Sequence, residues 1–506
     1  MHYVEIPWTT QATLPLLALL QLLPLALAVL MAVIRKHRIV FPIGVIGGIT
    51  VFLLTIAIYA SFDHNSTAMQ FAEQYKILGA FHYHAAVDGI SVLFTMLTAF
   101  LTLIIVLYGR ARQLGPAWRF LVLVFAVEST LMSQFLAVDL LWYTLASSTQ
   151  LILVGYLLWR WTTSVDSDLA FARYLQFMGV GSVLLLAGVI LLGWNHSDVT
   201  GGRWSFELYE LAKTPIQPEY RSVIFFLVFY GLGIRIPLFP LHGWLPLTAE
   251  HGTVAVAPVF LLGLKTGIYG LLRFVFPLMH EAVIRWHEFV VAFSVAGVFY
   301  AAILALMQVN LRRLLAYAVV SHTGILIIGL FSLGPTAFQG GVLLSINFGL
   351  AITGLLFMTG FVFSRTGTVL LTRLGGLFDR LPLIGATFLI AGLSIVGMPG
   401  TPGFDAVHLV LEAAIERFGT VVTITAALGN VAAAGFLLRA FQRVFLAQRQ
   451  KGEKLDVATA QPLETIIAVT LTAVLLINGF FSEPWLELIE TSVEGMSKLY
   501  LPVDGQ

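Results

Sequence analysis

The chain has 506 residues, of which 58% are hydrophobic and only 11% are charged, with a formal net charge of +1. A soluble domain carries about 25% charged residues, so this composition excludes a sizeable soluble domain and gives no basic surface for nucleic acid. Cysteine is absent, which excludes disulfides, thiolate-held iron–sulfur clusters and cysteine zinc sites.

Apolar runs of about 20 residues predict an all-α polytopic membrane protein with about fourteen transmembrane helices. The first run has no basic segment ahead of it and no small-residue cleavage site, so we interpret it as a span and not a signal peptide. The predicted spans are 12–34, 39–61, 86–109, 117–136, 139–159, 170–193, 222–240, 253–277, 286–308, 314–333, 340–363, 382–409, 418–445 and 462–482.

The distribution of basic residues predicts the orientation of these spans. Loops after odd-numbered spans hold roughly 18 of the 28 lysines and arginines, and cytoplasmic loops are the ones enriched in such residues. We therefore expect a multi-pass protein of the bacterial inner membrane with both termini in the periplasm. Polar residues 62–85 predict an outside loop with surface histidines and an interfacial helix, and the acidic, amphipathic segment 483–506 predicts a helix on the membrane surface.

Two predicted spans are interrupted by proline and glycine, at I-R-I-P-L-F-P (234–240) and G-M-P-G-T-P-G-F (397–404). Broken helices at membrane depth are tolerated where the freed backbone lines a cavity or is buried in protein. Their places, in spans seven and twelve, predict an inverted-repeat transporter with its site near the middle of the membrane.

Ionisable residues inside the predicted spans are the candidate path for protons or cations, because a charge at membrane depth is costly and usually functional. Arginine stays protonated and can only pair, whereas lysine and histidine can exchange protons. Asp405 and His408 are three residues apart and would share a helix face. The candidate path residues are Glu128, Arg235, His242, Lys265, His322, Asp405 and His408.

Other features predict no catalytic chemistry. Asp88 and Asp139 precede predicted spans, where an acid favours the helix N-terminus. No nucleotide-binding glycine motif and no set of metal ligands is present. We therefore expect no cofactor, no metal and no catalytic site of the chain's own, with a translocase activity only if the chain belongs to a redox complex.

Several motifs resemble the antiporter-like subunits of respiratory complex I and of multi-subunit cation/proton antiporters. They are V-D-G-I-S (87–91), F-L-A-V-D (135–139), P-L-F-P-L-H-G-W-L-P (237–246), L-K-T-G-I-Y-G-L-L-R-F (264–274) and L-R-R-L-L-A-Y-A-V-V-S-H-T-G (311–324), together with the second break. The resemblance implies two inverted five-helix repeats, so that 1–115 holds spans 1–3, 116–277 the first repeat, 286–445 the second, and 446–506 a cytoplasmic linker, the last span and an outside tail.

The resemblance also implies a charge path in which a span-five glutamate pairs with a span-seven lysine. Here Arg235 stands at the span-seven lysine and Lys265 matches the span-eight lysine. Span five has no acid, and Thr144 or Ser148 takes its place, so we expect Glu128 to replace that acid from the neighbouring helix. Span eleven has Asn347 and Phe348 where a histidine is common.

These departures make the chain most similar to the membrane subunit of the DAB-type inorganic carbon pump. That resemblance implies cation, and more specifically proton, translocation that energises uptake of CO2 or bicarbonate, with a large zinc-containing, carbonic-anhydrase-like partner. The alternative is a proton-pumping subunit of a respiratory NADH dehydrogenase or hydrogenase among other membrane subunits, or a cation/proton antiporter subunit.

Overall fold

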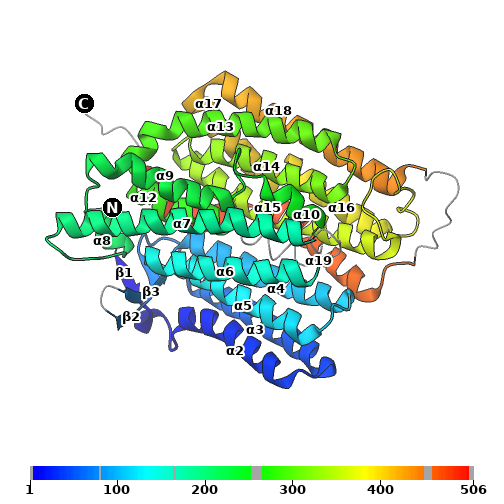
Figure 1. Cartoon of the computed structure of the whole chain (residues 1–506), viewed down its shortest axis with the longest axis horizontal. Coiled ribbons are helices and arrows are strands. Elements are labelled where there is room, and N and C mark those ends of the chain that lie inside the picture. The colour runs from blue at the N-terminus through cyan, green and yellow to red at the C-terminus, as the bar shows by residue number, and fades with distance from the viewer. Residues whose placement is uncertain (1–3, 79–80, 163–166, 252–264, 449–457, 501–506) are drawn as a thin grey trace.

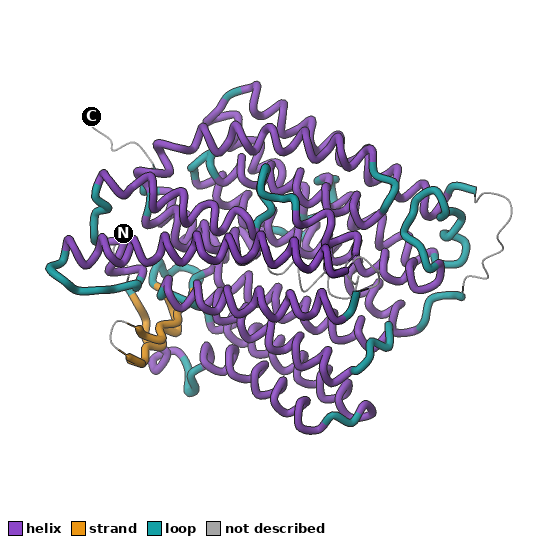
Figure 2. The backbone as a smooth tube through the Cα atoms, in the orientation of Figure 1, coloured by secondary structure: helices purple, strands orange, loops and turns teal. Residues whose placement is uncertain are grey.

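The computed structural model describes the chain except for residues 1–3, 79–80, 163–166, 252–264, 449–457 and 501–506. Long helices run side by side across the molecule, with a small sheet at one end (Figures 1 and 2). Within the described residues, 11 helices are long and apolar enough to cross a membrane. The predicted all-α membrane fold is therefore confirmed in its helical, multi-pass character.

The long helices before residue 252 match the predicted spans closely, and three short helices, α1, α8 and α10, lie outside them. In chain order they are α1 (Trp8–Gln11), α2 (Leu16–Ile34), α3 (His37–Ser61), α4 (Gly89–Ala111), α5 (Ala117–Leu136), α6 (Leu140–Arg160), α7 (Ser167–Val199), α8 (Leu208–Lys213), α9 (Pro218–Arg235) and α10 (Trp244–His251). Asp88 and Asp139 cap α4 and α6, as predicted: their carboxylates accept from the backbone N–H of Ser91 (2.9 Å) and Trp142 (2.7 Å).

After residue 264 the helices again follow the predicted spans. The first part of predicted span 253–277 lies outside the described residues, and its described part is helical from Lys265 onward. The remaining elements are the π-helix η1 (Leu271–Val275), α12 (Phe276–Leu278), α13 (His280–Met307), α14 (Leu311–Leu330), α15 (Pro335–Thr366), α16 (Pro382–Val396), α17 (Gly403–Phe418), α18 (Thr420–Phe441), the π-helix η2 (Gln442–Leu446), α19 (Pro462–Phe480) and α20 (Glu483–Ser497).

Both predicted helix breaks are present. The first separates α9 from α10, and the indole N–H of Trp244 donates to the Ile234 carbonyl oxygen (2.9 Å) that the break leaves near the end of α9. The second separates α16 from α17, and Gly397 ends α16 with a positive φ of 77°. A left-handed residue of this kind stops a helix at little cost only when it is glycine.

The prediction of an interfacial helix in 62–85 is wrong. This region forms strands β2 (Met69–Leu78) and β3 (Phe81–Val87), which pair antiparallel, and β1 (Glu5–Pro7) adds to β2 in parallel. Aromatic and β-branched residues favour strands over helices, and Phe71, Tyr75 and Tyr83 supply aromatic rings here. The resulting three-stranded sheet lies at one end of the helix bundle (Figure 2).

Two buried ionisable side chains fasten this sheet to the rest of the protein. The Glu73 carboxylate accepts from the backbone N–H groups of Leu17 and Ala18 (both 2.9 Å), which caps the start of α2. The His84 imidazole lies 2.7 Å from the Glu5 carboxylate and 3.4 Å from that of Glu207, and its side chain is only 2% exposed. His84 is therefore not the surface histidine that the sequence predicts.

The ion pairs of His84 predict a pH dependence of stability. Burial lowers the pKa of His84, but its hydrogen bonds and charge interactions with Glu207 and Glu5 outweigh burial and raise the pKa to about 9. A raised pKa means that the contribution to stability is complete below the unfolded value near 6.5 and is lost as the pH rises through about 9. The thermal unfolding temperature of the detergent-purified protein should fall between pH 7 and pH 10, and His84→Gln should flatten that fall. An equal slope in both proteins would contradict the assignment.

Helix α20 packs against protein along one face, although the sequence predicts a surface helix. Leu488, Ile489 and Val493 are fully buried. The Ser492 hydroxyl accepts from the Gly89 N–H (3.3 Å) at the start of α4. Gly89 allows this approach because a Cβ atom there would lie only 1.7 Å from the Leu488 carbonyl oxygen.

Replacement of Gly89 should therefore displace α20. We expect Gly89→Ala to destabilise the protein by about 1–3 kcal/mol, the usual cost of overpacking, measured as thermal unfolding in detergent. Gly179→Ala is the matched control, because a Cβ atom at that helical glycine meets nothing within 4 Å. A Gly89→Ala protein as stable as the control would show that α20 is not held at this contact.

Candidate functional site

Glu128 is a fully buried acid in the middle of α5. Its side chain is 0% exposed, and neither carboxyl oxygen has a hydrogen-bond partner within the described part of the chain. The Thr102 side chain of α4 approaches the carboxyl group without reaching hydrogen-bond geometry. A buried carboxyl group without partners is costly, so Glu128 occupies a position that general packing does not explain.

Arg235 ends α9 at the first helix break and is buried among hydroxyl groups. Its guanidinium donates to the Ser147 hydroxyl of α6 and to the Ser182 hydroxyl of α7 (3.2 Å for Ser182). No described carboxylate lies within ion-pair distance of Arg235, so the expectation that Glu128 pairs with it is wrong. The side chain that faces Arg235 from α6 is Ser147, and not Thr144 or Ser148, whose hydroxyls donate to carbonyls of their own helix.

Lys265 is a second buried cation, and it faces α15. Its side chain is 4% exposed, and its Nζ atom lies 5.0 Å from the centre of the Phe348 ring. A cation over an aromatic face is attracted by the ring quadrupole. Among the described residues no carboxylate pairs with Lys265. The lysine therefore does not serve there only as the counter-charge of a fixed acid.

His322 of α14 contacts the same aromatic ring, that of Phe348. Its imidazole stacks on Phe348 with 5.6 Å between ring centres and 25° between planes, and its Nδ1 atom is 3.1 Å from the Ala318 carbonyl oxygen. The structure therefore brings Lys265 and His322 to one residue, Phe348. The Phe348 side chain has no exchangeable proton, so the ring itself cannot relay one between the two groups.

Asn347, the neighbour of Phe348, satisfies the second helix break. Its amide Nδ2 donates to the Ser394 carbonyl oxygen (3.1 Å), and the Ser394 hydroxyl donates to its Oδ1 atom (2.5 Å). A Cβ atom on Gly403 would lie 1.9 Å from the same Ser394 carbonyl, so the start of α17 packs tightly here. Residues 347 and 348 thus connect the break in α16–α17 with Lys265 and His322.

The remaining predicted path residues lie apart from this centre. Asp405 accepts a hydrogen bond from the Ser482 hydroxyl near the start of α20, whereas His408 is exposed and stacks on Phe404. Asp405 and His408 both lie on α17, three residues apart, as the sequence predicts, and their role in the path stays a prediction. His242 lies in the first break, with its ring 5.8 Å from Phe239 and 5.3 Å from Tyr300.

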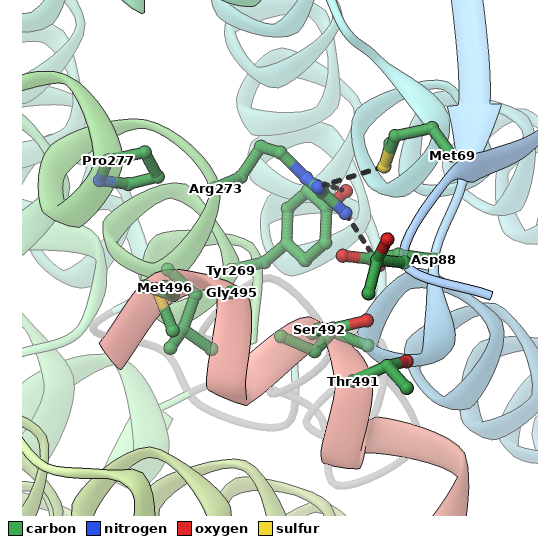
Figure 3. A pocket seen from close by; sticks show the side chains of 12 residues that line it. Met69, Asp88, Tyr269, Arg273, Pro277, Thr491, Ser492, Gly495 and Met496 are labelled. Carbon is green, nitrogen blue, oxygen red and sulfur yellow. Dashed lines mark hydrogen bonds and ion pairs between the residues drawn. The ribbon is translucent and has the colours of Figure 1, made fainter. Parts of the chain in front are cut away.

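A polar cluster that the sequence analysis missed lies at the sheet end of α4. Arg273 of η1 pairs with Asp88 (2.7 Å) and donates to the hydroxyls of Tyr269 (3.0 Å) and Ser91 (2.7 Å). Asp88, Tyr269 and Arg273 line a cavity of about 110 Å³ that α20 covers on one side (Figure 3). Tyr269 and Arg273 follow Lys265 at intervals of four residues, and this helical spacing is the sequence signal that would have linked them.

The site as a whole is a line of buried polar groups that contains no metal cluster. Within the described ranges no three His, Asp or Glu side chains come together as metal ligands. Arg235 is a fixed positive charge, Lys265 and His322 are exchangeable, and Glu128 is a separate buried acid. Chemically, the Lys265 amine and the His322 imidazole of this arrangement can take up and release protons.

Comparison with known proteins now identifies the family. A family model described as NADH:quinone oxidoreductase/Mrp antiporter, TM, matches residues 137–432. The chain belongs to this family. The resemblance inferred from the motifs is confirmed at this level, and the chain is an antiporter-like integral membrane protein.

Relatives of this antiporter-family protein align along nearly their whole length. NADH-quinone oxidoreductase subunit M of Rickettsia conorii is 29% identical over 473 residues, covering 91% of this chain and 93% of the relative. NADH-ubiquinone oxidoreductase chain 4 of Marchantia polymorpha is 27% identical over 485 residues, covering 94% and 95%. These relatives are named as subunits of multi-subunit enzymes.

Solved structures agree with the fold. A chain of respiratory complex I from Thermus thermophilus superposes with a TM-score of 0.85 at 28% identity, covering 96% of this chain and 100% of that one. A chain of the Mrp complex from Dietzia superposes with a TM-score of 0.86 at 20% identity, covering 97% and 99%. At that lower identity the Mrp likeness concerns the fold alone.

The contact between Arg235 and Ser147 predicts a specific loss of stability. Ser147→Ala adds no bulk and removes the acceptor of a buried guanidinium, so we expect a destabilisation of about 1–3 kcal/mol. Ser148→Ala is the control, since the Ser148 hydroxyl donates only to the Thr144 carbonyl of its own helix. Thermal unfolding in detergent measures both, and equal losses would mean that Ser147 does not hold Arg235.

Proposed function

We propose that the chain is a proton-translocating subunit of a multi-subunit redox complex of the bacterial inner membrane. The observation that carries the proposal is Lys265, a buried amine with no paired carboxylate among the described residues, in contact with the Phe348 ring that His322 also contacts. Alignment with complex I subunits along more than 90% of the chain supports the redox assignment.

The proposed mechanism assigns each buried group a different part. Lys265 takes up and releases the translocated proton, because an amine can exist charged or neutral. Arg235 stays charged and biases the potential at Lys265 by repulsion through a medium of low dielectric constant. Phe348 blocks direct exchange between Lys265 and His322, so a proton crosses between them only when water enters or the ring moves.

The positioning of the helix breaks supports the same mechanism. Trp244 and Asn347 donate hydrogen bonds to the freed carbonyl groups of Ile234 and Ser394. These bonds stabilise the two helix breaks. Asp405 is the acid at the second break, and we propose that it belongs to the outer part of the path together with Ser482. The two inverted five-helix repeats, 116–277 and 286–445, and periplasmic termini belong to the same proposal.

A second candidate function is the supply of a cation gradient for inorganic carbon uptake, with a large zinc-containing, carbonic-anhydrase-like partner. The observation that favours it is the hydroxyl of Ser147 in front of Arg235, where the family pattern implies an acid. The named relatives favour the redox complex over this candidate.

Purification of the tagged chain from detergent-solubilised membranes distinguishes the two functions. We expect quinone-reductase or hydrogenase subunits to co-purify, identified by mass. Recovery with one large, zinc-bearing soluble protein would instead establish the carbon-uptake candidate. Recovery with other cation/proton antiporter subunits alone would overturn the redox assignment and keep the antiporter-like role.

Lys265 is tested in the purified complex reconstituted into vesicles. Lys265→Ala should lower proton transport about tenfold or more, because the exchangeable group is removed. Lys265→Arg should fail equally, since it restores the charge but not the exchange. Lys213→Ala, at an exposed lysine of α8, is the control. Normal transport by the Lys265→Arg protein would refute proton exchange at this residue.

A further inference from the structure

A regular series of polar side chains runs along one face of α4. Asp88, Ser91, Thr95, Thr98 and Thr102 are spaced by three and four residues in turn, which places all five on one face of a helix. The four hydroxyl residues are at most 2% exposed. With a rise of 1.5 Å per residue, this hydroxyl stripe spans about 21 Å of the membrane.

Ordinary packing accounts for part of this stripe. The Thr95 and Thr98 hydroxyls donate to the Val92 (2.9 Å) and Phe94 (2.8 Å) carbonyls of their own helix, as buried threonines commonly do. Such a hydroxyl still has free acceptor lone pairs. The stripe alone therefore identifies no site. Its two ends show what it connects.

The outer end of the stripe opens into the cavity of about 110 Å³ beside Asp88. In Figure 3, Arg273 lies between Met69 and Asp88, and Ser492 of α20 lies close to Asp88. Thr67, which also lines the cavity, is exposed at the molecular surface. The cavity lining is mostly apolar, but Asp88, Tyr269 and Arg273 present polar groups to it, and its volume is large enough for several water molecules.

The inner end of the stripe meets Glu128. The Thr102 side chain is the polar group that approaches the Glu128 carboxyl, whose two oxygens are buried and make no hydrogen bond within the described residues. A buried, unpartnered carboxyl group requires a proton, a water molecule or both. The stripe therefore connects a solvent-reaching cavity to a buried acid that lacks a partner.

Lys265 lies beside the stripe at half its length. The Lys265 Cε atom and the Leu97 Cδ2 atom would each lie 3.1 Å from a Cβ atom on Gly349, so the lysine stem packs beside Leu97, the neighbour of Thr98. One helical turn toward the sheet, the Tyr269 hydroxyl is 2.9 Å from that of Ser91. The segment that carries Lys265 and Tyr269 therefore packs against α4, with Tyr269 on the stripe itself and Lys265 at Leu97, about 100° around the helix from Thr98.

We propose that the hydroxyl stripe of α4 is a hydrated proton path that joins the Asp88–Arg273 cavity to Glu128 and passes Lys265. The proposal rests on the proposed proton translocation and adds its route on the sheet side of the membrane. Each transfer moves one proton between neighbouring waters and hydroxyls, and at the inner end a Glu128 carboxylate gains that proton to become a carboxylic acid. The hydroxyls hold the waters in line as acceptors.

Water in the stripe can be tested without any transport assay, because the chain contains no cysteine. Thr95→Cys, Thr98→Cys and Thr102→Cys are each labelled with 2-aminoethyl methanethiosulfonate in the purified full chain. This reagent reacts with a hydrated thiolate and not with a dry thiol. Leu93→Cys and Ile104→Cys are buried positions on the opposite face of α4 and serve as controls.

The stripe positions should react about tenfold or more faster than the two controls. Ser492→Trp, which fills the cavity, should slow labelling of Thr98→Cys in the double variant. Size-exclusion chromatography confirms that each variant is folded. Stripe and control positions that react at one rate would overturn the proposal, because the stripe would then be dry packing.

A transport measurement separates this proposal from the proposed function. In reconstituted complex, Thr98→Val should lower proton transport about tenfold, Thr98→Ser should retain it, and Thr50→Val on the exposed side of α3 should have no effect. Loss in Lys265→Ala with full transport in Thr98→Val would overturn the path and leave the proposed function standing. Fast labelling of the stripe together with full transport in Lys265→Ala would overturn the proposed role of Lys265 and leave the hydrated stripe standing.

Discussion

Carbonyl groups released by a broken helix must find hydrogen-bond donors inside a membrane, where water is scarce. In this protein Trp244 supplies the donor at the first break and Asn347 supplies it at the second. Both donors come from side chains that also border the polar line through the molecule. The breaks can therefore persist at membrane depth, and the ionisable groups keep an irregular, polar backbone around them.

The charges of this site are arranged by separation and not by pairing. Arg235 is solvated by serine hydroxyls, Lys265 rests against an aromatic ring, and Glu128 has neither cation within ion-pair distance. A tight buried pair gains much of its energy from fixed geometry and is costly to break. Separated groups leave each charge free to respond to a proton that arrives or departs. Lys265 and His322 both contact Phe348, whose ring carries no charge.

Much of the fold follows from the sequence because membrane spans obey a simple length and hydropathy rule. The bounds of α5 and the breaks at Arg235 and Gly397 follow from apolar runs and from proline and glycine. The sheet was missed because its strands mix polar and apolar residues. Such a segment does not show by its composition alone whether it forms a helix or a strand. Partners across the fold, such as Glu73 at the start of α2, depend on tertiary packing that one sequence does not display.

The site was predictable in its members but not in its connections. Burial of an ionisable residue can be inferred from the apolar run around it, so Glu128, Arg235 and Lys265 were found. Which of them touch depends on helix rotation, and a residue shift of one moves a side chain by about 100° around the axis. That is why Ser147, and not Thr144 or Ser148, faces Arg235. The hydroxyls of α4 went unnoticed because neutral residues do not stand out in an apolar span.

The sheet at the end of the bundle also constrains the order in which the protein is assembled at the membrane. Strand β1 is synthesised before α1, α2 and α3, yet its partner β2 emerges only after α3 is complete. The carboxylate that caps α2 comes from that same late strand, and Glu207, the second partner of His84, emerges after α7. The first two spans must therefore enter the lipid as an untethered pair, and they are fastened from outside only when later segments have been translated.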